Sequence, residues 1–107
     1  MTDDSDPGFR YAEIAEELTA RGVSRATMFG MPCLKDAAGK AFAGLHQGEL
    51  VCRLGRDSPA LAEALRLPGA HLFDPVGGRP MQDWACIPPG AAAHWDNYAE
   101  AALIARR

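Results

Sequence analysis

Turn-forming residues divide the middle of this chain into segments of strand length. Residues 36–40 (Asp-Ala-Ala-Gly-Lys) and the pair Gln47-Gly48 are both typical of tight turns, and the two turns lie about nine residues apart. The segments that follow them, 41–46 and 49–54, are short and mostly apolar. Turns at this spacing predict a meander of antiparallel strands rather than a parallel sheet.

The two ends of the chain carry helical patterns instead. Apolar residues recur at helical spacing from Phe9 to Leu18, with glutamates on the other face. Asp6 and Pro7 suit a helix cap and a first helical residue, and Gly22 suits a helix end. A second apolar stripe follows Gly90, so we expect a helix at each end of the chain.

These patterns predict one α+β domain over residues 1–107, with residues 1–8 as a flexible arm. The fold expected is an antiparallel meander sheet of about five strands packed with N- and C-terminal helices. The predicted elements are a helix over 8–21, a strand over 27–34 interrupted by Gly30 and Pro32, strands over 41–46 and 49–54, a short helix over 60–67, strands over 71–76 and 83–87, and a helix over 90–107.

Composition excludes several classes of protein. Fourteen acidic residues against 11 basic ones give a net charge of -3, which is unlike a strongly basic nucleic-acid-binding protein. No apolar run reaches the roughly 18 residues of a membrane span, and the acidic N-terminus is unlike a secretory signal. The chain has three cysteines, Cys33, Cys52 and Cys86, which lie far apart in the sequence. An odd number of widely spaced cysteines does not suggest a disulfide framework, which favours a reducing compartment and so the cytoplasm.

The residues with catalytic or metal-binding chemistry form no local motif. Cys33, His46, Cys52 and His71 would have to meet in the sheet, because no CxxC or HxxxH spacing is present. We therefore predict no catalytic residue, no metal ligand and no cofactor. An alternative hypothesis is a small thiol- or ligand-binding protein that uses Cys33, the thiol beside Pro32, or His46.

A second alternative is weak nucleic-acid binding through a basic face of the sheet. Lys40, Arg53 and Arg79 would form that face if the fold gathers them. The loop 77–80 (Gly-Gly-Arg-Pro) is read first as a hairpin turn, with anion binding by its backbone amides as the alternative. Trp84 is expected to pack in the core, with ligand stacking as its alternative role.

Residues 26–34 (Ala-Thr-Met-Phe-Gly-Met-Pro-Cys-Leu) resemble the Met-Phe-Gly segment of the TfoX/Sxy N-terminal domain family. Residues 39–45 and 49–54 resemble the second and third strands of that family. Further similar positions are Phe73, Trp84 and the pair Ile87-Pro88. Met31 and Leu34 depart from the pattern, which often has a second glycine and an aromatic residue at those places. The YjbR/MmcQ-like group, with a similar meander, is a related alternative.

The resemblance implies an α+β fold, no catalytic residues, no cofactor and a regulatory role. We therefore expect a non-enzymatic module that binds a protein partner or a second copy of itself, with no membrane partner. Gly30 is expected to bend the first strand so that Phe29 packs under the first helix, with a peptide-docking edge at 30–34 as the alternative. The residues singled out for interaction are Phe29, Gly30, Met31, Pro32, Lys40, Arg53, Arg79 and Trp84.

Overall fold

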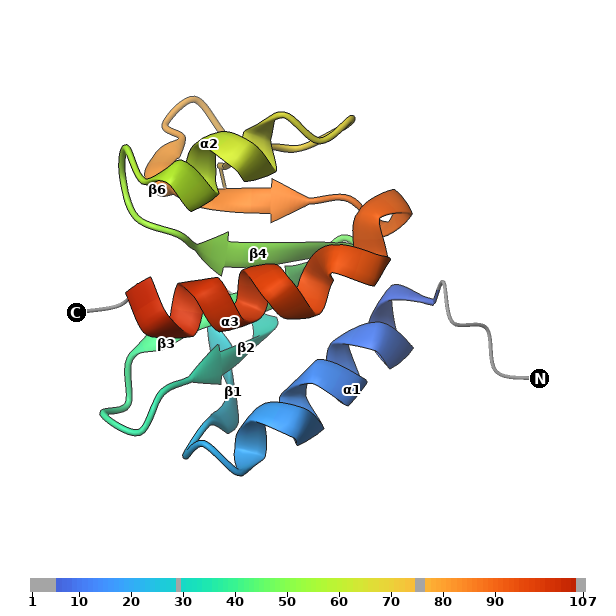
Figure 1. The fold of residues 1–107 in the computed structure, drawn as a ribbon, viewed down its shortest axis with the longest axis vertical. Coiled ribbons are helices and arrows are strands. Elements are labelled where there is room, and N and C mark those ends of the chain that lie inside the picture. The colour runs from blue at the N-terminus through green and yellow to red at the C-terminus, as the bar shows by residue number, and fades with distance from the viewer. Residues whose placement is uncertain (1–5, 29, 75–76, 106–107) are drawn as a thin grey trace.

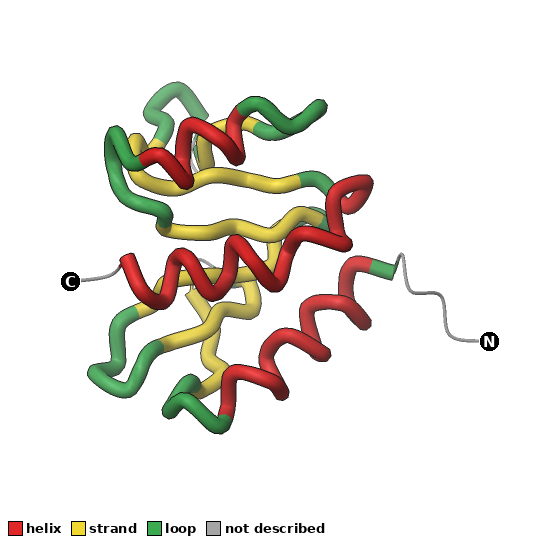
Figure 2. The backbone as a smooth tube through the Cα atoms, viewed as in Figure 1, coloured by secondary structure: helices red, strands yellow, loops and turns green. Residues whose placement is uncertain are grey.

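The fold is a single antiparallel sheet with helices packed on one of its faces (Figure 1). It is described from a computed structural model, which covers residues 6–28, 30–74 and 77–105. Helices occupy the two ends of the chain and one short stretch in the middle, and strands fill the rest (Figure 2). The elements are α1 (Pro7–Thr19), β1 (Ser24–Met28), β2 (Met31–Lys35), β3 (Ala41–His46), β4 (Glu49–Arg53), α2 (Pro59–Leu65), β5 (His71–Phe73), β6 (Met81–Ile87), the 3-10 helix η1 (Pro89–His94) and α3 (Trp95–Ala105).

The predicted α+β class and meander are confirmed. The strand order is β1-β2-β3-β4-β6-β5, and every neighbouring pair is antiparallel. The sheet has six strands, one more than the roughly five expected. The extra strand arises because residues 27–34 do not form one bent strand.

The chain reverses direction within that segment. Met28 pairs with Met31, so β1 and β2 form a hairpin joined by residues 29 and 30. Gly30 has a φ of +75°, a backbone conformation that suits glycine in a tight turn. Gly30 therefore separates two strands, where the sequence suggested that it bends one.

The first helix begins and ends close to where its sequence predicts. The Asp6 carboxylate accepts a hydrogen bond of 3.1 Å from the Gly8 amide, which caps α1, and Pro7 is its first residue. The helix ends at Thr19, two residues before the predicted end, and Gly22 follows with a φ of +84°. Ser58 caps α2 in the same way, through a 3.0 Å hydrogen bond from the Leu61 amide.

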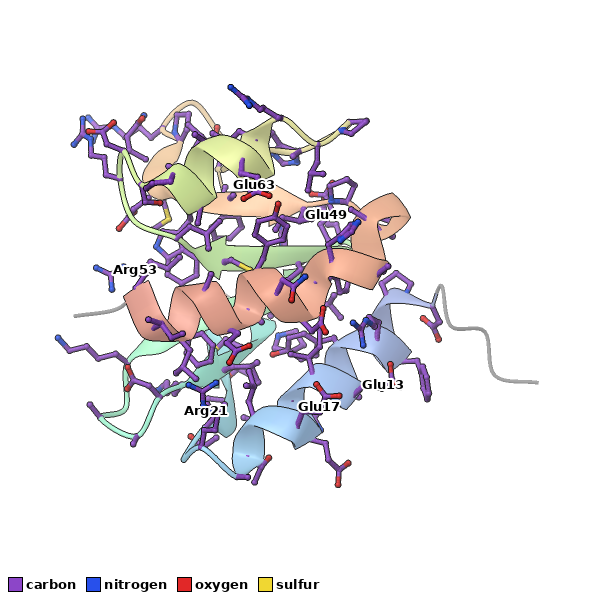
Figure 3. The ribbon with its side chains drawn as sticks, in the orientation of Figure 1. Glu13, Glu17, Arg21, Glu49, Arg53 and Glu63 are labelled. Atoms are coloured by element: carbon purple, nitrogen blue, oxygen red, sulfur yellow. The ribbon has the colours of Figure 1, made fainter. Side chains whose placement is uncertain are left out.

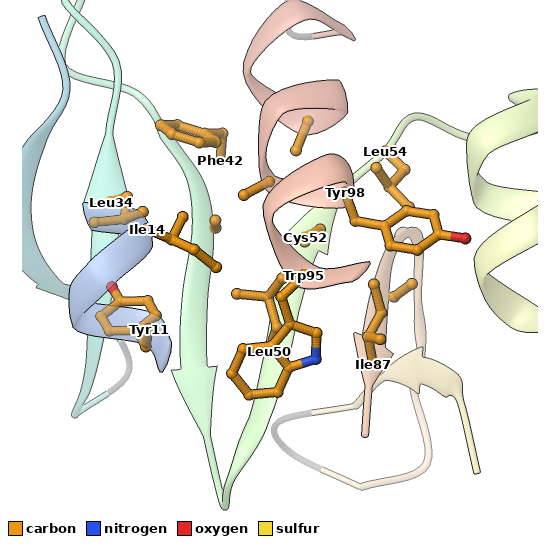
Figure 4. Packing of buried hydrophobic residues seen from close by; sticks show 14 of the residues in the cluster. Tyr11, Ile14, Leu34, Phe42, Leu50, Cys52, Leu54, Ile87, Trp95 and Tyr98 are labelled. Atoms are coloured by element: carbon orange, nitrogen blue, oxygen red, sulfur yellow. The ribbon is translucent and has the colours of Figure 1, made fainter. Parts of the chain in front are cut away.

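The main core lies between the sheet and the helices (Figure 4). All three α-helices lie on the same side of the sheet in Figure 1. Trp95, at the start of α3, is completely buried and donates its indole N–H to the Pro88 carbonyl oxygen at 3.1 Å. The fully buried side chains that surround it on the sheet and helices include Ile14, Phe42, Leu50, Leu54 and Ile87.

The opposite face of the sheet carries a second, smaller cluster and no described helix covers it. We call this face the open face; its cluster consists of Met31, Val51, Phe73, Trp84 and Cys86. Val51, Phe73 and Cys86 are each no more than 1% exposed, and Met28, Ala41 and Met81 pack against their cluster. Trp84 is 6% exposed, which confirms the core role expected for it.

The second half of the chain differs from the sequence prediction at its boundaries. Strand β5 ends at Phe73 rather than 76, although 75 and 76 lie outside the described residues. Strand β6 begins at Met81, two residues earlier than predicted. The terminal helix is split: Ala91 leaves helical geometry within η1, and α3 begins only at Trp95. Pro88 is the N-cap residue of η1 and Pro89 its first residue.

Among the described residues, no helix combines the length and the apolar character needed to cross a membrane.

Candidate functional site

A polar pocket of about 390 Å³ opens at one end of the open face. Strand pairing brings its side chains together, because His46 is the partner of Glu49 across the β3–β4 turn and His71 is the partner of Cys86. Glu49 lies two residues from Val51, and Val51 pairs with Cys86, so these side chains share one face. The principal lining side chains are His46, Glu49, His71, Phe73, Asp74 and Cys86.

The turn at Gln47-Gly48 sets the geometry of this end of the sheet. Gln47 has a φ of +52° and Gly48 a φ of +80°. Two central residues with positive φ form the tight hairpin turn whose twist matches that of the flanking strands. The turn therefore holds His46 and Glu49 directly opposite each other at the mouth of the pocket.

His71 is held at both ring nitrogens. Its Nδ1 donates to the Leu72 carbonyl oxygen at 2.9 Å, since a carbonyl oxygen only accepts. Its Nε2 lies 2.9 Å from Glu49 Oε1. The hydrogen bond to Leu72 and the Glu49 carboxylate raise the pKa of His71 above its ordinary value, while partial burial opposes them. The charged imidazolium, which donates at both nitrogens, fits this arrangement best.

Cys86 faces the same carboxylate. Its side chain is 1% exposed, and its sulfur lies within 4.8 Å of a Glu49 carboxylate oxygen. Burial and the nearby negative charge raise the pKa of the Cys86 thiol to about 12. The thiol therefore stays protonated at neutral pH.

Aromatic rings connect the pocket to the middle of the open face. The rings of His46 and Phe73 meet edge to face, with their centroids 5.4 Å apart. Phe73 in turn lies 6.3 Å from Trp84, in a tilted arrangement. His46, Phe73 and Trp84 thus form a continuous series of ring contacts from the pocket to the middle of the open face.

Replacing Glu49 with glutamine should lower the pKa of His71, since the amide carries no negative charge. The pKa should stay above the ordinary value of about 6.5, because the Leu72 carbonyl remains. A folded-state pKa above the unfolded one stabilises the fold below about pH 6.5, and that contribution is lost as the pH rises through the folded value. NMR of the imidazole C–H signals across a pH series measures the shift.

The His94 signals provide an internal reference for that series, because His94 lines a hollow with α2 and α3 residues, away from Glu49. An unchanged His71 midpoint in Glu49→Gln would contradict the contact between the two side chains.

The structure places the residues that the sequence singled out in several regions. Phe29 lies outside the described residues, so its packing under the first helix stays a prediction. Gly30 is exposed in the β1–β2 turn, Met31 is buried in the open-face cluster, and Pro32 is exposed on β2. Strand β2 pairs with β1 on one side and β3 on the other, so residues 31–35 are no free edge for a docking peptide.

The three basic residues lie at the same end of the sheet. Lys40 precedes β3, Arg53 ends β4 and Arg79 precedes β6, and these antiparallel strands meet there. Arg53 Nε lies 3.2 Å from Asp83 Oδ2, so an acidic neighbour offsets its charge. Figure 3 shows Arg53 and Glu49 at opposite ends of β4, which separates the basic end from the polar pocket.

The loop that was considered for anion binding already holds a carboxylate. The amides of Gly77, Gly78 and Arg79 donate to Asp74, at 2.8, 2.8 and 3.3 Å. The backbone geometry that attracts an anion is therefore present, and the Asp74 side chain occupies it.

The thiol favoured from sequence is placed where reactivity is low. Cys33 has no exposed surface and lies on β2 between β1 and β3. Burial raises its pKa, with Lys35 acting in the opposite direction. Cys52 belongs to the core under the helices, and burial raises its pKa as well. Of the three thiols, Cys86 alone is in the group of polar side chains at the pocket.

The sequence does not identify Glu49 or Cys86 as site residues. It indicates His71 only as one of four residues that would have to meet in the sheet to bind a metal. The three positions lie far apart along the chain and match no ligand spacing. One signal was available: a two-residue turn at Gln47-Gly48 implies that His46 and Glu49 face each other. The pairing of β5 with β6, which adds His71 and Cys86, has no comparable signal.

Comparison with protein-family models, with curated proteins and with solved structures finds no match to this chain. The resemblance to the TfoX/Sxy N-terminal domain family stays a prediction.

Proposed function

We propose that this chain is a small regulatory module that binds a ligand in the pocket formed by His46, Glu49, His71 and Cys86, without catalysing a reaction on it. The observation that carries the proposal is the convergence of Glu49, His71 and Cys86 on one solvent-accessible point of the open face. Their ligand-type atoms all lie within 4.8 Å of one another. The core packing of the strands does not require such a group.

The hydrogen bonds favour binding over nucleophilic catalysis. A catalytic thiol needs a base that accepts its proton. Here burial, together with the negative charge of Glu49, raises the pKa of the Cys86 thiol to about 12 and keeps it in the unreactive protonated form. His71 is engaged at both nitrogens, by Leu72 and Glu49, so it presents no free nitrogen to the thiol.

The contacts around the pocket supply a route from ligand to surface. A ligand at Glu49 and His71 would shift His46 or Phe73, which touch each other, and Phe73 packs beside Trp84. Met31 belongs to the same cluster, and the partly exposed Met28 and Met81 pack against it. Methionine side chains adapt readily to a partner surface, so this face suits a module that reports its ligand to a protein. A regulatory role also agrees with the family resemblance stated above.

The test is an amide NMR titration of the full chain with several classes of small ligand: divalent metal ions, carboxylates, phosphate monoesters and amines. At least one class should shift the amides of residues 46–49 and 71–74 together, and should change the fluorescence of Trp84. A Trp95→Phe background isolates that fluorescence, because Trp95 lies in the other core.

The combined variant Glu49→Gln, His71→Asn should weaken the response at least about tenfold, as expected when charged hydrogen-bonding partners are lost. Glu17→Gln, the same change on the exposed face of α1, is the matched control and should leave it intact. If no class shifts these amides, or if the combined variant responds like the wild type, the proposed function is wrong.

A further inference from the structure

Three side chains from three neighbouring strands present three different metal-ligand atoms to one point. Glu49 supplies a carboxylate oxygen from β4, His71 the imidazole Nε2 from β5, and Cys86 the sulfur from β6. These atoms lie within 4.8 Å of one another. Around a tetrahedral zinc ion with bonds of about 2.0–2.3 Å, ligand atoms are separated by about 3.3–3.8 Å. Small side-chain rotations therefore suffice to close the group around an ion.

The orientation of His71 matches that of a metal ligand. Histidines that bind metals almost always donate their other ring N–H to a carbonyl or carboxylate oxygen, which fixes the tautomer and aims the free nitrogen at the ion. The Nδ1 of His71 donates to the Leu72 carbonyl oxygen at 2.9 Å. That hydrogen bond leaves Nε2 as the nitrogen that faces Glu49 and Cys86.

A divalent cation fits the charges that these three side chains supply as metal ligands. A carboxylate, a neutral imidazole and a thiolate together carry two negative charges, so a doubly charged ion balances them.

We propose that Glu49, His71 and Cys86 bind one zinc ion through a carboxylate oxygen, Nε2 and Sγ. The inference rests on the proposed function and names the ligand of the same pocket. Sulfur and imidazole ligands favour zinc over magnesium and calcium, which prefer oxygen ligands throughout. Three protein ligands would leave a fourth coordination position of a tetrahedral ion for water or for a ligand from a partner.

Isothermal titration of the full chain with zinc chloride tests the site. One ion should bind per chain, and titrations in buffers of different ionisation enthalpy should show proton release, because the Cys86 thiol must lose its proton to bind the ion. Cys86→Ala should reduce that release, and both Cys86→Ala and His71→Asn should weaken binding at least about tenfold. Circular dichroism confirms that each variant is folded.

The matched controls remove the same side chains elsewhere. Cys33→Ala removes a buried thiol on β2, and His94→Asn removes an exposed imidazole on the helix side. Both should bind zinc with the wild-type affinity. Cys86 is buried, so Cys86→Ala could fail to fold. In that case His71→Asn tests the site, because the His71 side chain is 55% exposed and its replacement should leave the fold intact.

The outcomes separate this inference from the function on which it rests. If zinc does not bind, or binds equally to the wild type and to His71→Asn, the zinc site is wrong. A different ligand class that still shifts the amides of 46–49 and 71–74 would then leave the proposed function in place. If no ligand of any class shifts them, both fail.

Discussion

Replacing Gly44 with alanine is expected to destabilise the fold by about 3 kcal/mol, because β2 and β3 leave no space for a methyl group. A Cβ at this position would lie 2.5 Å from Met31 Cε and 2.8 Å from the Pro32 carbonyl oxygen. The methionine end can move, but the carbonyl oxygen belongs to the backbone of β2. Cys33, the next residue of β2, pairs directly with Gly44 of β3, so moving that backbone would disturb the pairing of β2 with β3.

Urea unfolding followed by circular dichroism measures the effect. Gly90→Ala is the control, because a Cβ at Gly90 would meet no heavy atom within 4 Å beyond its chain neighbours, and the stability should change by less than about 1 kcal/mol. The double variant Met31→Ala, Gly44→Ala should recover little, since the Pro32 oxygen remains. If Gly44→Ala were as stable as the wild type, the close approach of β2 to β3 would be wrong.

Truncation of Trp95 to alanine should cost about 4 kcal/mol, the usual range for a large aromatic residue removed from a core. Trp95 has no exposed surface and packs among residues of the sheet and α3 under the helices (Figure 4). Its indole N–H also satisfies the Pro88 carbonyl oxygen, which anchors the start of α3 to the end of β6. Trp95→Phe should cost less, because most of the apolar contact is kept.

Denaturant unfolding followed by far-ultraviolet circular dichroism is the appropriate measurement, since the substitution alters the fluorescence. Ile104→Ala is the control: it removes an aliphatic side chain from the same helix, but one that is 53% exposed. Its effect should stay within about 0.5 kcal/mol. A Trp95→Ala variant that loses no more stability than Ile104→Ala would contradict the position of α3 on the sheet.

The fold was largely predictable because its signals are local. Asp6-Pro7 and Ser58-Pro59 mark helix starts through capping chemistry, and the turn at Gln47-Gly48 marks a hairpin. The main error, one strand in place of the β1–β2 hairpin, has a local cause as well. Gly30 and Pro32 interrupt an apolar run, and an interruption alone does not distinguish a bend from a reversal.

Most of the candidate site could not be predicted from the sequence, because it depends on pairing between strands that lie far apart along the chain. His46 and Glu49 meet across a two-residue turn and were predictable as neighbours. His71 and Cys86 join them only because β6 lies between β4 and β5 in the sheet. No pattern in the sequence predicts this strand order. Lys40 and Arg79 lie in loops next to β3 and β6, where the two-residue alternation of strand side chains no longer determines which face they take.

X-ray absorption spectroscopy of the zinc-loaded chain tests the central claim most directly, because it reports the ligand atoms themselves. Glu49, His71 and Cys86 predict one sulfur at about 2.3 Å and nitrogen or oxygen ligands at about 2.0–2.2 Å. The sulfur contribution should disappear in Cys86→Ala and remain in Cys33→Ala. A first coordination shell without sulfur in the wild type, or one whose sulfur survives in Cys86→Ala, would contradict the site.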